Sequence, residues 1–111
     1  MAFIVYSINS MEKDDIYALI NRRRRQLLVH SVIYYRLNEN LVTDDIWASW
    51  GRELVELQER HPDIADEVPY ADAFRDFDPS TGYNLPLTDP WAVNTARYLL
   101  EIERRKNDAE R

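Results

Sequence analysis

Residues 11–37 contain neither proline nor glycine, so no residue in this run interrupts a helix. Ser10 precedes the run as a suitable N-cap, and Asn38-Glu39-Asn40 follows it as a turn. Residues 26–37 are apolar on nearly every side, which is typical of a helix that several neighbours cover. We therefore expect a long central helix, with one face formed by Ile16, Ile20, Leu27 and Tyr34.

A second helix is expected to begin after Thr43, which is a good N-cap followed by two acidic residues that the helix dipole favours. It ends at His61-Pro62, because proline disfavours helical angles in the residue before it. Apolar residues recur along it with helical spacing and predict a buried stripe of Trp47, Trp50, Leu54 and Leu57.

The second half of the chain begins with an acidic segment, residues 63–88, in which we expect irregular structure and one helical turn near residues 70–74. Gly82 is the natural left-handed residue of a turn there. Asp89-Pro90 then opens a last helix, with Asp as N-cap and Pro at the first position. The expected packing face of this helix is Trp91, Thr95, Tyr98, Leu99 and Ile102.

These patterns predict a mainly α fold: a small helical domain with a long central helix, a second helix packed on it, an irregular acidic segment and a C-terminal helix. Its 111 residues suit one domain, with the acidic loop and last helix over residues 64–106. Phe3–Tyr6 is the exception, where we expect a short edge strand or a packed arm.

Composition excludes several classes of function. The chain has no cysteine, so it has neither a disulfide nor a thiol nucleophile, and its apolar runs are too short to span a membrane. The absence of a basic, then apolar leader leads us to expect a cytoplasmic location. Residues 1–37 carry a formal charge of +3 and residues 38–111 carry −9, and this acidic body argues against direct nucleic-acid binding.

Four consecutive arginines, Arg22–Arg25, spread their charges around the helix and form no single stripe. Arg23 falls near the apolar face, so it must snorkel, pair with a carboxylate or contact an anion. The two histidines, His30 and His61, do not form a recognisable metal pair. We expect His30 to be a hydrogen-bonded helix residue and His61 to end a helix. We find no set of residues arranged for catalysis and expect no metal site and no enzyme activity.

One group of residues suits a binding site. Tyr34 and Tyr35 end the first helix, and Asp44 and Trp47 lie three residues apart at the start of the second. The short connection at residues 38–42 is expected to bring the two pairs together. Aromatic faces beside a carboxylate suit a flat cationic or amide-bearing ring. The alternative is ordinary packing, with Trp47 in the core stripe and Asp44 as a first-turn acid.

Three stretches in residues 23–63 carry a family resemblance: His30-x-x-x-Tyr34-Tyr35-Arg36-Leu37-Asn38, Val42-Thr43-Asp44-Asp45-x-Trp47 and the run from Arg52 to Asp63. Together they resemble the N-terminal Ia domain of bacterial NAD-dependent DNA ligases. In that family the Ia domain is a helical module that recognises the nicotinamide mononucleotide (NMN) half of NAD. Nothing resembling the ligases' adenylation or DNA-binding domains follows.

The resemblance implies a ligand site made by Tyr34, Tyr35, Asp44 and Trp47, where Trp47 replaces a ring-stacking tyrosine of the family. Ala48 stands where the family has a second aspartate, which removes a polar contact worth about 1–3 kcal/mol. Small stand-alone proteins of this kind look like those of bacteriophages and prophages.

Two functions stay open. The first is a non-catalytic interaction module, a phage or prophage accessory or anti-defence factor that binds a bacterial or phage protein through its acidic half. The second is a binding module for NMN or NAD. The sequence favours the first. Ala48 removes a contact from the ligand site, whereas no substitution weakens the acidic surface that a protein partner would bind. A third hypothesis, an NAD-consuming hydrolase, has less support, because Asp44 would be the one carboxylate available to act near the ribose.

Overall fold

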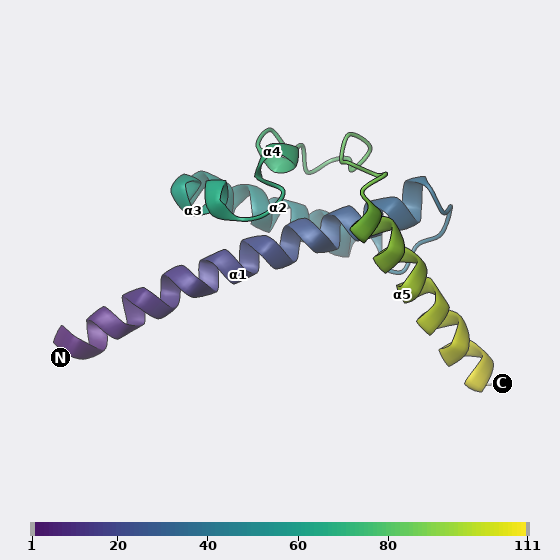
Figure 1. Cartoon of the computed structure of the whole chain (residues 1–111), viewed down its shortest axis with the longest axis horizontal. Coiled ribbons are helices and arrows are strands. Elements are labelled where there is room, and N and C mark those ends of the chain that lie inside the picture. The colour runs from purple at the N-terminus through teal and green to yellow at the C-terminus, as the bar shows by residue number, and fades with distance from the viewer. Residues whose placement is uncertain (1, 111) are drawn as a thin grey trace.

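The structure, a computed structural model, describes the backbone of residues 2–110 and the side chains of residues 12–110. Over this part of the chain the elements are all helices, which confirms the mainly α prediction. Figure 1 shows a long first helix, with the other helices packed along its C-terminal half. In chain order they are α1 (Ala2–Tyr35), α2 (Asp44–Arg60), α3 (Pro62–Glu67), α4 (Ala71–Phe74) and α5 (Pro90–Ala109).

Helix α1 starts earlier than the sequence suggested. Its backbone is helical from Ala2, so both the strand or arm at Phe3–Tyr6 and the N-cap at Ser10 are wrong. The first proline or glycine of the chain is Gly51, so no residue breaks the helix at its start. The first half of α1 projects away from the other helices, and the molecule measures 56 × 33 × 26 Å along its principal axes.

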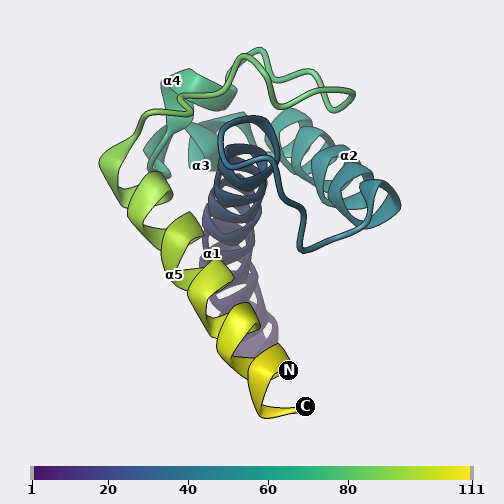
Figure 2. The ribbon, with the colours of Figure 1, turned by 90° about the vertical axis from the view of Figure 1, so that its right-hand side faces the viewer.

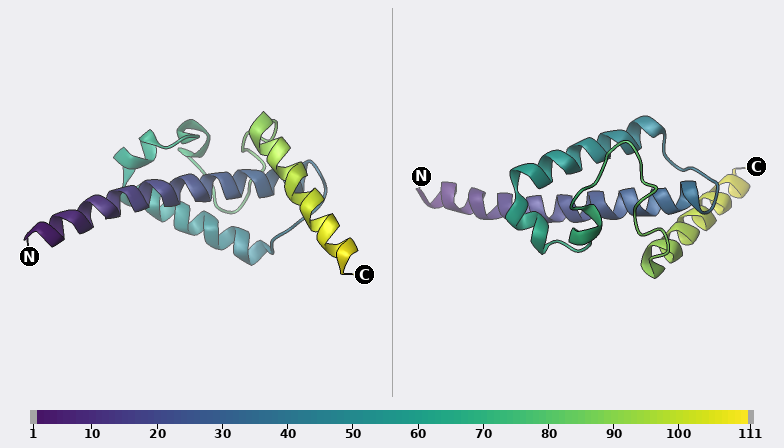
Figure 3. Two further views of the ribbon diagram at one scale, coloured as in Figure 1. Left: turned by 60° about the horizontal axis from the view of Figure 1, so that its bottom comes forward. Right: turned by 90° about the horizontal axis from the view of Figure 1, so that it is seen from above.

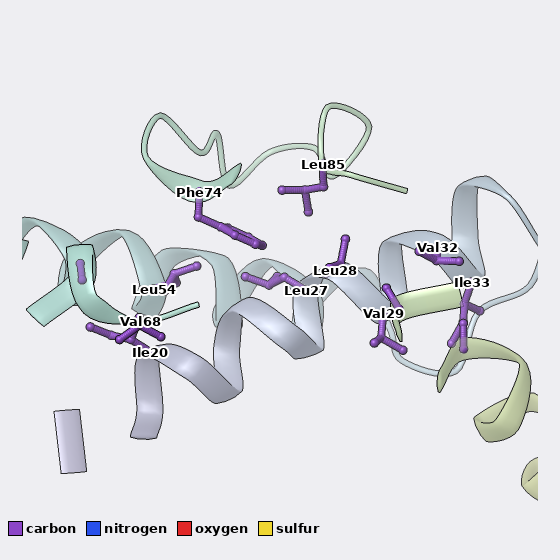
Figure 4. Packing of buried hydrophobic residues seen from close by; sticks show 13 residues of the cluster. Ile20, Leu27, Leu28, Val29, Val32, Ile33, Leu54, Val68, Phe74 and Leu85 are labelled. Carbon is purple, nitrogen blue, oxygen red and sulfur yellow. The ribbon is translucent and has the colours of Figure 1, made fainter. Parts of the chain in front are cut away.

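The second half of α1 forms the centre of the hydrophobic core. Figure 2, which looks along α1, shows α2 and α5 on different sides of it and α3 and α4 above. Figure 4 shows Phe74 and Leu85 directed toward the α1 residues below them. The buried apolar residues of α1 are Ile20, Leu27, Leu28, Val29, Val32 and Ile33, and the other segments contribute Leu54, Ala65, Val68, Phe74, Leu85, Ala92 and Ala96.

Helix α2 follows its sequence signals closely. Thr43 is the N-cap, and its Oγ1 accepts a hydrogen bond from the amide of Ile46 at 3.3 Å. His61 is the C-cap, as Pro62 required. The predicted stripe packs on the core, with Leu54 fully buried and Trp47, Trp50 and Leu57 partly buried. The short α3, which directly follows, was not predicted.

The buried arginine of the Arg22–Arg25 run is Arg24, which is 1% exposed. Its guanidinium donates to the carbonyls of Ala65 (3.0 Å), Val68 (2.9 Å) and Pro69 (3.2 Å) and, through Nε, to Gln58 Oε1 (3.0 Å). These carbonyls lie at the C-terminal end of α3, where helical carbonyls lack intrahelical partners and a cation is favoured. Arg24 therefore fastens α3 to α1.

The structure corrects the orientation assigned to Arg23. This residue is half-buried, and its Nε donates to Glu53 Oε2 at 3.3 Å, so it takes the carboxylate-pairing alternative. Arg24 shares its face with Ile20 and Leu28, each four residues away, which places it inward in place of Arg23. Arg25 lies over the ring of Trp91, with Cζ 4.6 Å from its centroid.

Helix α5 packs on α1 mainly through residues other than those predicted, although the predicted Leu99 is partly buried against the core. Its N-cap is Asp89, as expected, and Asp89 Oδ2 accepts from the amide of Ala92 at 3.0 Å. The buried residues are Ala92 and Ala96, whereas Trp91, Tyr98 and Ile102 are exposed. Small side chains allow the two helix backbones to approach closely. The alanines, and not the larger apolar residues, therefore form the buried face of α5.

The segment between α4 and α5 crosses back over α1, as Figure 3 shows. Gly82 lies in this segment, but its φ is not positive, so the left-handed turn predicted there is wrong. Glycine is needed for a different reason. A Cβ atom at residue 82 would lie 2.1 Å from Ser31 Oγ and 3.0 Å from Trp47 Cζ2. Only a residue without a side chain allows the segment to lie so close to α1 and α2.

In the part of the chain that the structure describes, no helix combines the length and apolar character needed to cross a lipid bilayer.

Candidate functional site

The last turn of α1 and the first turn of α2 form one wall each of a surface pocket. Tyr34 and Tyr35 come from α1, and Asp44 and Trp47 come from α2, so all four predicted binding residues line the same cavity. The pocket has a volume of about 330 Å³, which lies within the range of small-molecule sites. The predicted juxtaposition of these residues is therefore present in the structure.

Two features position the walls. The connection at residues 36–43 is short, and it reverses the chain at Asn38, which adopts a left-handed conformation with φ 55°. The N-cap at Thr43 then fixes the start of α2, which points Trp47 toward the core and leaves Asp44 exposed at the rim. The carboxylate and the aromatic rings therefore stand on rigid helical turns, a suitable support for a binding site.

A third wall comes from residues 79–82, which the sequence did not indicate. Tyr35 Oη and Thr81 Oγ1 lie 3.1 Å apart in a hydrogen bond that joins this loop to α1. The rings of Tyr35 and Tyr83 also meet in a T-shaped, edge-to-face arrangement, with centroids 5.5 Å apart. The loop lies far along the chain from the two helices, and its proximity depends on the bare backbone at Gly82. This tertiary contact has no local sequence signal.

His30 also lines the pocket, and the centroid of its ring lies 5.4 Å from that of Trp50. Burial lowers the pKa of its imidazole from the usual 6.5, because a low-dielectric environment disfavours the charged form. Among the described residues, none forms a hydrogen bond with its buried Nδ1. Sequence reasoning expected a hydrogen-bonded histidine here, and for Nδ1 the structure differs.

The depressed pKa of His30 predicts how stability depends on pH. The folded state binds a proton at His30 less readily than the unfolded state, so the free energy of unfolding falls as pH drops through about 6.5. We expect His30→Gln to flatten this slope between pH 7.5 and pH 5.5 in urea denaturation. An equal slope in the variant and the wild type would contradict the prediction.

Other candidate residues lie elsewhere. Arg23, the weaker candidate for an anion contact, pairs with Glu53 and does not line the pocket. Among the side chains of residues 12–110, no three of His, Asp or Glu gather as a metal site would require. The pocket is therefore the one place where predicted binding residues meet.

Comparisons with known proteins add no relative. No family model matches the sequence, and neither a curated protein nor a solved structure matches the chain. The resemblance to the ligase Ia domain stays a prediction from the sequence.

Proposed function

We propose that this protein is a non-catalytic binding module whose pocket takes a nicotinamide-bearing ligand such as NMN or NAD. The supporting observation is the meeting of Tyr34, Tyr35, Asp44 and Trp47 around a single cavity of about 330 Å³. The aromatic rings offer faces for stacking, and the carboxylate attracts a positively charged ring. A module of this kind binds its ligand without changing it chemically.

Pocket composition also supports a ligand with hydroxyl and amide groups. Ser80 and Thr81 bring hydroxyl groups to the third wall, and Asn40 brings an amide. Ala48 lines the pocket near Asp44, so the pocket offers one carboxylate where the ligase Ia domains that the sequence resembles have two. We therefore propose weak binding, in which stacking and the Asp44 charge carry the affinity.

Calorimetric titration with NMN and with nicotinamide riboside tests the proposal. We expect saturable heat at ligand concentrations up to the millimolar range, together with a change in tryptophan emission. Tyr34→Leu is the informative variant, because Tyr34 is 54% exposed and its loss should leave the fold intact. We expect it to weaken binding by about three- to tenfold, the worth of an aromatic contact.

Tyr98→Leu is the matched control. Tyr98 is a tyrosine of similar exposure, 65%, but it lies on α5 and does not line the pocket. Its replacement should leave the affinity unchanged. If neither ligand gives saturable heat, or if both variants weaken binding equally, the pocket is not the site.

A protein-interaction module is the second candidate, and the projecting first half of α1 favours it (Figure 1). Glu12, Lys13, Asp14 and Asp15 of this half are exposed. A phage accessory or anti-defence factor of this kind would bind a bacterial or phage protein in a salt-dependent way. The calorimetric experiment separates the candidates, because this one requires no ligand heat.

A further inference from the structure

The pocket has an unusual charge balance for a nucleotide site. Asp44 is the one acidic side chain among its lining residues, and none of the arginines and lysines in the described part of the chain lines the cavity. His30 adds no positive charge, because burial favours its neutral form. A ligand in the pocket therefore meets a net negative charge.

The arginines nearest in sequence do not supply the missing cation. Arg36 follows Tyr35 directly, but its Nη1 donates to the carbonyl of Leu87 at 3.2 Å and it does not line the pocket. Arg52 and Arg75, each four residues from a lining residue, do not line the pocket either, and Arg23 is paired with Glu53. A phosphate group at this site would thus lack the guanidinium or ammonium partner that phosphate recognition usually employs.

The N-terminus of α2 is another source of positive potential beside the pocket, and it is already compensated. Thr43 Oγ1 accepts a hydrogen bond from the amide of Ile46, which is one of the free donors of the first turn. Asp44 and Asp45 place two carboxylates at the same end, where they offset the helix dipole. The site is therefore suited to a cation and poorly suited to an anion.

We infer that the pocket selects a flat organic cation that lacks phosphate, such as an N-substituted pyridinium nucleoside, over the corresponding 5′-phosphate. The inference rests on the proposed function, since it assigns the ligand class of the same pocket. The aromatic rings stack on the pyridinium, Asp44 attracts its positive charge, and a phosphate group is repelled by the same carboxylate. Nicotinamide riboside fits this description, and NMN differs from it by the phosphate alone.

Titration of the full chain with nicotinamide riboside and NMN at equal ionic strength tests the inference. We expect the riboside to bind about five- to tenfold more tightly, as one screened charge–charge repulsion would produce. Asp44→Asn should weaken riboside binding more than NMN binding and so reduce this ratio. Raising the salt concentration should also reduce it.

Asp63→Asn is the matched control, because Asp63 is an exposed first-turn aspartate of another helix, α3, and does not line the pocket. It should preserve the ratio. Equal or tighter binding of NMN overturns the inference and leaves the proposed function standing. A ratio that Asp44→Asn does not change overturns the role of Asp44. Absence of saturable heat with both ligands overturns the proposed function and the inference together.

Discussion

Arg24→Met is expected to destabilise the protein by about 3–5 kcal/mol, a large part of the roughly 5–15 kcal/mol that holds a domain of this kind folded. Methionine preserves the unbranched aliphatic stem of arginine, but the substitution removes every hydrogen bond of the guanidinium. The carbonyls of Ala65, Val68 and Pro69 then lose a charged donor, and Gln58 Oε1 loses the Nε–H that it accepts from. Urea denaturation followed by circular dichroism measures the loss.

The arginine run supplies its own control. Arg22 is exposed two positions earlier on the same helix, so Arg22→Met should change the free energy of unfolding by about 0.5 kcal/mol or less. Arg24→Lys keeps the charge but forms fewer hydrogen bonds, and it should fall between the wild type and Arg24→Met. If Arg22→Met and Arg24→Met cost the same, the anchoring role assigned to Arg24 is wrong.

Local signals explain the parts of the fold that could be predicted. Thr43 and Asp89 are side chains that satisfy free helix amides, and this chemistry depends on the next three residues alone. A short connection between two well-marked helix ends also brought Tyr34 and Tyr35 to Asp44 and Trp47. The predicted half of the candidate site is therefore the half made by neighbours in the sequence.

The parts that were missed depend on contacts between distant segments. The loop that completes the pocket reaches α1 because Gly82 fits against Ser31, and a single glycine does not reveal its partner. The buried face of α5 was missed because hydrophobicity marked Trp91 and Tyr98, whereas close helix packing selected Ala92 and Ala96. Arg24 was missed because its main partners are backbone carbonyls at the end of α3 and just after it, which sequence periodicity does not show.

Gly82→Ala tests the closest of these contacts. The new Cβ would lie 2.1 Å from Ser31 Oγ and 2.9 Å from Ser31 Cβ, so either the loop or the serine must move. Ser31 is held by a hydrogen bond from its Oγ to the carbonyl of Leu27 at 2.6 Å, which makes displacement of the loop the expected outcome. Overpacking of this kind costs about 1–3 kcal/mol.

Because residues 79–82 form the third wall of the pocket, the displaced loop should also abolish measurable ligand binding by Gly82→Ala. Ser31→Ala removes the Oγ atom that clashes most severely, so the cost of Gly82→Ala should be smaller in a Ser31→Ala background. A double-mutant cycle in urea denaturation is expected to show a coupling of about 0.5–3 kcal/mol. Additive costs in that cycle would mean that residue 82 does not contact Ser31 on α1. They would contradict the placement of residues 79–82 as the third wall of the pocket.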